Sequence, residues 1–249
     1  VTFTPGAGNT ATSTITTSVN SVSADGTSSA TLTVTLKDAQ GNNLTSGGQT
    51  VALSNTGSGT ISAITDNNNG TYTATITNTI AESTTISGTL NGATLTDTAI
   101  IVFTSGTIST GTTLISASPS TTDANGVSNI VITIQAKDNL GNNLTFGGST
   151  IALNQNGSAS IQPVIDNGDG TYTASVSSTV AETILIQGTV DGTPVTNTES
   201  ITFLPGPATT AQTTITATPA IITANGITNS TINIQTKDAQ GNNLTAGGA

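Results

Sequence analysis

The stretch KDAQGNNLT at residues 37–45 returns as KDNLGNNLT at residues 137–145 and as KDAQGNNLT at residues 237–245. Shorter matches keep the same offset of 100 positions, with no insertion or deletion; they are GTYT at 70–73 and 170–173, AE at 81–82 and 181–182, and phenylalanine at 3, 103 and 203. Chance does not produce co-linear copies of this kind. The repetition predicts an array of similar domains, each about 100 residues long.

Within each copy the apolar residues recur with a period of two. In TLTVTL at 31–36 and TYTATIT at 71–77, threonine alternates with leucine, valine, tyrosine, alanine or isoleucine. Such alternation of β-branched residues is typical of half-buried strands, and no stretch shows the period of a helix. The predicted inward side holds Leu32, Val34, Leu36, Tyr72, Ala74 and Ile76 in the first copy, and Ile132, Ile134, Ala136, Ile232, Ile234 and Thr236 in the next two.

Turn signals separate these strands. Glycine preceded by asparagine or aspartate, or followed by asparagine, lies between the alternating stretches, and we expect Gly26, Gly41 and Gly70 to form turns. Short strands with a turn every eight to twelve residues or so are the pattern of a sandwich. The fold class predicted is therefore all-β, with tandem immunoglobulin-like antiparallel β-sandwich repeats of about 100 residues.

The repeat boundaries follow from the same alignment. Residues 1–8 should hold the last strand of a preceding repeat and a junction, 9–106 and 107–206 two complete repeats, and 207–249 the N-terminal half of a further repeat. The junctions are too short for flexible linkers. Half a sandwich leaves an apolar face uncovered. We therefore expect either that the chain is a section of a longer array or that another molecule completes the half repeat.

The composition argues against chemistry that needs reactive side chains. The 249 residues include three basic residues, all lysine, against 13 acidic ones, and no histidine, cysteine, methionine or tryptophan. A net charge of -10 does not suit nucleic acid or an anionic membrane surface. The commonest general base and the thiol nucleophile are absent. We predict no catalytic, cofactor-binding or metal-binding residue, no enzymatic activity and no membrane insertion.

The order of the motifs resembles the bacterial Ig-like repeats of the invasin/intimin adhesin family. The stretches that carry the resemblance are SADGTSSATLTV at 23–34, KDAQGN at 37–42, DNNNGTYTA at 66–74 and DNGDGTY at 166–172. The resemblance covers essentially the whole chain. It implies tandem sandwich domains that carry a receptor-binding tip away from a cell surface. In that family the tip is a lectin-like terminal domain rich in aromatic residues and cysteine, and nothing in this chain matches it.

Two local motifs admit a sharper interpretation. DNGDG at 166–170 resembles a calcium loop, but its aspartates are three apart and the equivalent DNNNG at 66–70 keeps only one, so a hairpin turn is favoured. Lysine recurs once per repeat, at Lys37, Lys137 and Lys237, near asparagines and the repeated Ala-Glu pair. A Lys–Asn isopeptide is one interpretation. A solvated lysine that protects a strand edge or pairs with the adjacent aspartate is the favoured one.

Two surface features also leave alternatives open. The outward threonines could form a flat face that binds ice or polysaccharide, although threonine on a strand with few charges also serves β-propensity and solubility, which is the favoured interpretation. Phe146 stands where the first repeat has Ser46, and it either caps a domain junction or marks a small contact patch.

The function predicted is a structural stalk or spacer in a bacterial cell-surface adhesin. One alternative is a self-assembling extracellular fibre or surface-layer subunit completed by strand exchange between copies of the chain. A second alternative is a repeated polysaccharide-binding module. The predicted partners are the neighbouring Ig-like repeats, with a host or surface receptor bound by a region outside this chain. The predicted location is extracellular or at the bacterial cell surface.

Overall fold

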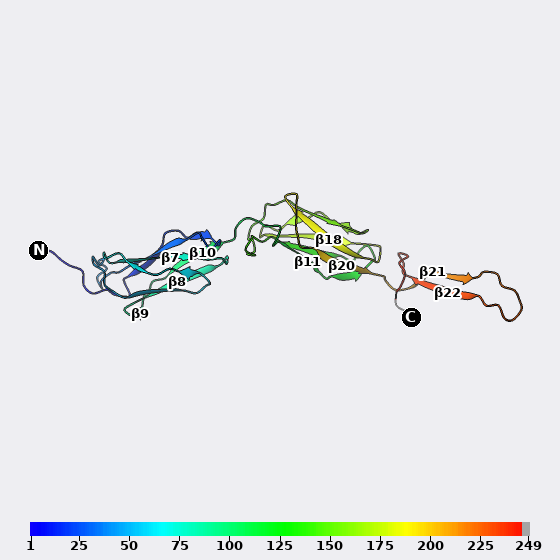
Figure 1. The fold of residues 1–249 in the computed structure, drawn as a ribbon, viewed down its shortest axis with the longest axis horizontal. Coiled ribbons are helices and arrows are strands. Elements are labelled where there is room, and N and C mark those ends of the chain that lie inside the picture. The colour runs from blue at the N-terminus through cyan, green and yellow to red at the C-terminus, as the bar shows by residue number, and fades with distance from the viewer. Residues whose placement is uncertain (246–249) are drawn as a thin grey trace. The chain divides into compact units, whose positions relative to one another are not determined.

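Threonine alternating with aliphatic residues produces the strands of both complete repeats, because β-branched side chains suit a pleated, half-buried surface. The computed structural model describes residues 1–245, and within that range the secondary structure consists of strands and turns without a helix. Figure 1 shows β8 and β10 of the first repeat running alongside each other, and β18 and β20 doing the same in the second.

The first repeat forms two five-stranded sheets. Its strands are β1 (Thr14–Thr17), β2 (Ser21–Ser23), β3 (Ala30–Thr35), β4 (Val51–Asn55), β5 (Thr60–Ile61), β6 (Thr65–Asp66), β7 (Thr71–Thr77), β8 (Ser83–Leu90), β9 (Ala93–Thr94) and β10 (Ala99–Thr104). One sheet has the order β1-β3-β7-β5, with β6 also paired to β7. The other has the order β2-β10-β8-β4, with β9 paired to β8. This is an immunoglobulin-like sandwich.

The second repeat reproduces this topology strand for strand. Its strands are β11 (Leu114–Ser118), β12 (Thr121–Asp123), β13 (Ile130–Gln135), β14 (Ile151–Gln155), β15 (Ser160–Ile161), β16 (Ile165–Asp166), β17 (Thr171–Ser177), β18 (Thr183–Val190), β19 (Thr193–Pro194) and β20 (Glu199–Leu204). The sheet orders are β11-β13-β17-β15 and β12-β20-β18-β14. The prediction of tandem Ig-like sandwiches is therefore confirmed.

In each of the two complete repeats one strand pair is parallel, whereas the other pairs are antiparallel. Strand β2 pairs with β10, with Val22 opposite Phe103. Strand β12 pairs with β20, with Thr122 opposite Phe203. Because β2 lies near the start of its repeat and β10 at the end, this pairing joins the two ends of the repeat side by side.

The core of each sandwich lies between its two sheets. Leu32, Val34 and Leu36 are fully buried, and Tyr72 and Ile76 complete the predicted inward side, which is confirmed. The second repeat buries the equivalent set, which includes Ile115, Ile130, Ile132, Ile134, Ala136, Tyr172, Val176, Ile186 and Phe203. The expected turns also form, because Gly26, Gly41 and Gly70 all have positive φ.

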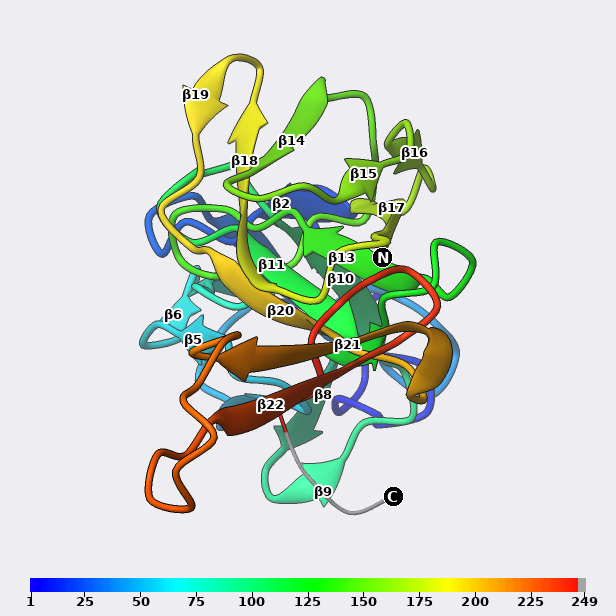
Figure 2. The same ribbon diagram turned by 90° about the vertical axis from the view of Figure 1, so that its right-hand side faces the viewer.

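The third repeat contributes a hairpin of β21 (Thr209–Thr218) and β22 (Thr231–Lys237), which Figure 2 shows in orange and red. Ile215, Ile232 and Ile234 are 69%, 59% and 64% exposed. The predicted apolar face is thus present, and within residues 1–245 no second sheet covers it. At the other end, residues 1–8 form no strand, and Phe3 is exposed although its equivalents in β10 and β20 are buried.

The described chain divides into two compact units that do not coincide with the sequence repeats. The first unit comprises Val1–Ile108 together with Lys137–Leu144, and the second comprises Ser109–Ala136 and the chain from Thr145 onward. Residues 137–144, which belong to the second repeat by sequence, therefore pack with the sandwich of the first repeat.

Candidate functional site

The outward face of β1, β3 and β7 carries a regular threonine array. Cross-strand register places Thr14, Thr35 and Thr71 in one row, Thr16, Thr33 and Thr73 in the next, and Thr31 beside Thr75. The equivalent face of the second repeat is interrupted by Leu114, Val131 and Gln135. The array is thus a property of one repeat.

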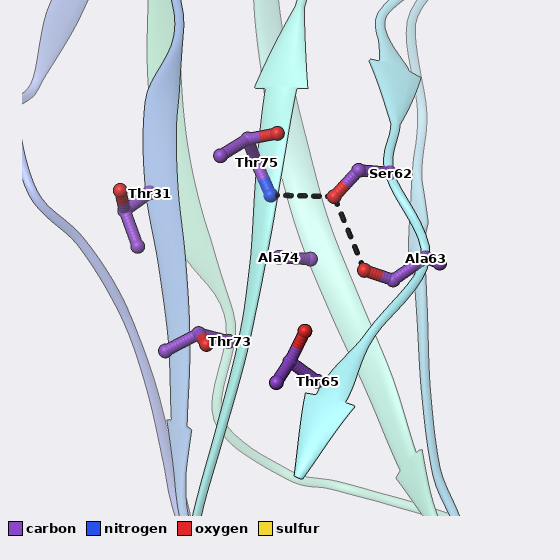
Figure 3. Close-up of a pocket in the computed structure, with 7 residues that line it drawn as sticks. All are labelled: Thr31, Ser62, Ala63, Thr65, Thr73, Ala74 and Thr75. Atoms are coloured by element: carbon purple, nitrogen blue, oxygen red, sulfur yellow. Dashed lines mark hydrogen bonds between the residues drawn. The ribbon is translucent and has the colours of Figure 1, made fainter. Parts of the chain in front are cut away.

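A shallow groove of about 150 Å³ lies beside this array in the first unit (Figure 3). Its walls come from β3, β7 and the segment between β5 and β6, with Thr31, Ser62, Ala63, Thr65, Thr73, Ala74 and Thr75 as the lining residues. Ser62 Oγ accepts a hydrogen bond from Thr75 N at 2.9 Å and donates to Ala63 O at 3.2 Å. The lining offers hydroxyl and methyl groups and no charged or aromatic side chain, so it can contact a hydroxylated surface but holds no catalytic group.

The carboxylates at Asp66 and Asp166 accept hydrogen bonds from their own turns and from the glycine pairs at 47–48 and 147–148. Asp166 accepts hydrogen bonds from Gly148 N at 2.7 Å and Gly168 N at 2.8 Å, and Asp66 makes the equivalent contacts. The side chain and N–H of Thr171 both donate to Asp169 and lower its pKa. Among residues 1–245 no three acidic side chains gather where they could share a cation. The geometry is that of the hairpin turn that the sequence favoured.

The repeated lysine also serves a turn. Lys137 Nζ donates to Asn143 Oδ1 at 2.7 Å and to Gly141 O at 3.2 Å. The glutamate of the same repeat, Glu182, accepts instead from Ser158 N in another loop at 2.7 Å. An isopeptide requires a carboxyl group beside a buried lysine and asparagine, and Lys137 is only partly buried. Phe146, which replaces the Ser46 of the first repeat, is 53% exposed.

The largest recurring network of polar side chains lies in the loop at the end of β3, β13 and β22. This loop, at residues 37–44, 137–144 and 237–244, is here called the Asx loop. Its aspartates Asp38, Asp138 and Asp238 are all buried. Each accepts hydrogen bonds from N–H groups of its own loop and from a glycine 32 positions earlier; the glycine bonds are Gly6 N to Asp38, Gly106 N to Asp138 and Gly206 N to Asp238, at 2.9 to 3.0 Å. A buried carboxylate supplied with several donors stays ionised.

These hydrogen bonds lower the pKa of the Asx-loop aspartates. The Asn42 side chain and the Gly6 N–H lower the pKa of Asp38 to about 2 from an ordinary 3.8. For Asp138, burial raises the pKa, but the hydrogen bonds from Gly106 and Asn142 outweigh burial and lower it. A folded-state pKa below the unfolded value means that the unfolded chain binds more protons as the pH falls. The carboxylates therefore stabilise the fold above the ordinary pKa and lose that contribution as the pH falls through the folded pKa.

We expect the melting temperature to hold from neutral pH down to about pH 5 and to fall as the pH drops below about 4. Thermal unfolding followed by circular dichroism from pH 7 to pH 2 measures this. Asp138→Asn is expected to be less stable at pH 7 and to show a shallower acid dependence. An acid dependence equal to that of the unmodified chain would mean that other carboxylates control acid unfolding.

The Asx loop at residues 137–144 also forms hydrogen bonds with the sandwich against which it packs. In the first unit Asn142 Nδ2 donates to Thr79 O at 3.0 Å, and Ala81 N donates to Asn142 Oδ1 at 2.9 Å. Sequence reasoning offered Asp38 only as a pairing partner of the adjacent lysine, and it used Asn42 only as part of the turn signal at Gly41. The signal that could have found them is the threefold recurrence of Asp, Gly and Asn at identical spacing.

The family model described as invasin, domain 3, matches residues 9–106 and again residues 109–206. The chain belongs to this invasin domain 3 family. The two matches lie on the two sandwiches described above, and the resemblance to invasin/intimin repeats that the motifs indicated is confirmed.

Solved structures of adhesins are similar to these invasin domain 3 repeats. The Escherichia coli adhesin FdeC is 26% identical, with a TM-score of 0.65, over 98% of this chain and 78% of that chain. Yersinia pseudotuberculosis InvD is 25% identical, with a TM-score of 0.61, over 95% and 73%. Invasin, a bacterial integrin-binding protein, is 27% identical, with a TM-score of 0.54, over 83% of this chain and 41% of that chain. No curated protein sequence matches the chain.

The comparisons identify an Ig-like segment of a cell-surface adhesin. Membership of the invasin domain 3 family points to a non-enzymatic role. In the part of the chain that the structure describes, no helix is both long enough and apolar enough to cross a membrane.

Proposed function

We propose that this chain is a stalk segment that holds another part of a bacterial adhesin away from the cell surface and bears tension along its length. The observation that carries the proposal is the parallel pairing of β2 with β10, and of β12 with β20, which joins the first and last parts of each repeat. Supporting contacts extend each pair; in the first repeat Val102 N donates to Asn20 O at 3.0 Å and Ala24 N donates to Thr104 O at 2.9 Å.

The geometry suits a load applied through the two ends of a repeat. Two parallel strands pulled from opposite ends slide along each other, so all their hydrogen bonds carry the load together. An antiparallel hairpin pulled at its open end would lose its bonds one after another. Resistance to force depends on the rate of unfolding, and hydrogen bonds that must break together raise that barrier.

Force spectroscopy on the full chain tests the proposal. Each sandwich is expected to give a separate force peak and to release roughly 300 Å, at about 3.3 to 3.6 Å per extended residue. Ala24→Pro removes the N–H that bonds Thr104 O and should lower the peak of the first repeat. The second repeat, in which Ala124 N still bonds Leu204 O at 2.8 Å, is the internal reference. Extension without resolved peaks would contradict a load-bearing stalk.

In this proposal, other regions of the adhesin bind the receptor and anchor the protein at the bacterial surface. Invasin is described as integrin-binding, and the similarity covers 41% of that chain, so its receptor contact is not transferred here. The neighbouring repeats are the partners proposed for this segment. The stalk is also proposed to have no catalytic activity, since its carboxylates serve turns and loops.

A second candidate function, a fibre assembled by strand exchange, would use the exposed isoleucine face of β21 and β22. In the second repeat the equivalent face is covered by the opposite sheet, where Ile132 and Ile134 are buried. Strands from another copy of the chain could cover Ile232 and Ile234 and so build a fibre. Sedimentation at increasing concentration separates the two functions, because a stalk remains a single species whereas strand exchange gives growing assemblies.

A further inference from the structure

The Asn142 side chain fits a pair of main-chain groups at one end of the first sandwich. Residues 78–82 connect β7 to β8, so Thr79 O and Ala81 N lie outside the strand ladder. A primary amide carries one acceptor and two donors. Asn142 Nδ2 donates to Thr79 O at 3.0 Å and its Oδ1 accepts from Ala81 N at 2.9 Å, so both main-chain groups are satisfied by one side chain.

The same contact is made in the second unit by the third Asx loop. Asn242 Nδ2 donates to Thr179 O at 3.0 Å, and Ala181 N donates to Asn242 Oδ1 at 2.8 Å. In both units the asparagine lies 63 positions after the residue whose carbonyl it bonds and 61 positions after the residue whose N–H it accepts. Two independent copies of one geometry make it a built feature of the repeat.

The adjacent buried aspartate fixes the asparagine in this orientation. Asn142 Nδ2 uses its second hydrogen to donate to Asp138 Oδ2 at 2.9 Å, and Asn142 N donates to Asp138 Oδ1 at 2.9 Å. Asp138 Oδ2 also accepts from Gly106 N, which follows the last strand of the first sandwich. The Asx loop therefore holds the first sandwich at two places, the β7–β8 turn and the exit of β10.

Asn42 provides the contrast. Its Nδ2 bonds both oxygens of Asp38, at 3.2 and 3.0 Å, and among the described residues its side chain contacts no main-chain turn of the kind that holds Asn142. The internal bonds of this Asx loop thus form without a contact to a β7–β8 turn. The contacts with Thr79 and Ala81 are separate from the folding of the loop itself.

We propose that Asn142 and Asn242 are coupling residues, through which each repeat stabilises the sandwich that precedes it in the chain. In arrays of this kind the stability of a domain includes a term from the interface with its neighbour. A substitution in one repeat then destabilises the repeat before it. The coupling deepens the proposed stalk function, and its biological use rests on that function.

Amide hydrogen exchange on the full chain, resolved by residue, tests the coupling. Asn142→Ala is expected to accelerate exchange of the Ala81 amide about fivefold or more, the loss of one net hydrogen bond, and to leave the Ala181 amide unchanged. Asn242→Ala should do the reverse. Asn42→Ala, which loses its own bonds to Asp38, is the matched control and should leave the Ala81 amide near its original rate.

Either of two results would overturn the coupling. The first is an unchanged Ala81 rate in Asn142→Ala, or acceleration confined to residues 109–206. The second is an equal acceleration at Ala81 in Asn42→Ala. Failure of the stalk is distinguishable, because the force peaks report it directly. If exchange is altered but no force peaks are seen, the stalk proposal fails and the coupling stands. If force peaks are intact but exchange is unaltered, the coupling fails and the stalk proposal stands.

Discussion

Tyr72→Ala is expected to lower the free energy of unfolding of the first sandwich by about 3 to 5 kcal/mol, as other deletions of a buried aromatic ring do. The ring is 2% exposed and lies between the sheets. Its hydroxyl oxygen accepts a hydrogen bond from Gln49 N at 2.9 Å. Removal of the side chain leaves a cavity in the core and an unpaired N–H near its edge, and both effects destabilise.

Because the chain has two tyrosines, one per sandwich, fluorescence of a Tyr72 variant follows the unchanged second repeat separately. Tyr172 occupies the equivalent place in the second sandwich, and the chain contains no tryptophan. Denaturant unfolding of Tyr72→Phe, followed by fluorescence, therefore reports the second repeat through Tyr172, while circular dichroism reports both. Tyr72→Phe should lose only about 1 kcal/mol, the value of one hydrogen bond. A loss below about 1 kcal/mol for Tyr72→Ala would place the ring outside the core.

Gly70→Ala is expected to destabilise the first sandwich by about 2 to 5 kcal/mol, the sum of backbone strain and a steric clash. Gly70 has φ +85°, a conformation that side chains rarely adopt, and an added Cβ would lie 2.0 Å from Leu44 O. The contact cannot be relieved by a side-chain rotation, because Leu44 O is a main-chain atom of the Asx loop. Denaturant unfolding of the full chain measures the loss.

Gly92→Ala is the matched control for this substitution. Gly92 has φ +86°, almost the same value, but an added Cβ there would meet nothing within 4 Å. It should lose only the strain of the left-handed conformation, about 1 to 2 kcal/mol. Equal losses for the two variants would show that the close approach of residues 44 and 70 is not a constraint on the fold.

Much of the architecture could be predicted from the sequence because it is written in local periodicity. Leu32, Val34 and Leu36 alternate with threonine, and a period of two assigns them to one face of a strand without knowledge of the partner strand. The turn at Gly70 follows from the Asn-Gly pair in the same way. The exact offset of 100 positions then extends each local assignment to the next repeat.

The features that the sequence did not predict depend on contacts between distant residues. Strand β2 is three residues long, too short for an alternation signal, and its parallel pairing with β10 joins positions about 80 apart. The sequence offered Asp138 only as a pairing partner of the adjacent lysine, yet Asp138 is 2% exposed and accepts hydrogen bonds from Gly106 and Asn142. Whether a polar residue is buried depends on the groups that surround it in the fold, and these cannot be predicted from the local sequence.

The fixed separation of 63 positions between Asn142 and Thr79, repeated for Asn242 and Thr179, has a genetic consequence. Recombination between repeats in register adds or removes whole repeats, and every new joint then brings the same asparagine to the same main-chain groups. An insertion that displaces the Asx loop from the β7–β8 turn would remove these bonds. A change in the number of whole repeats therefore leaves the Asx-loop contacts of each remaining joint in place.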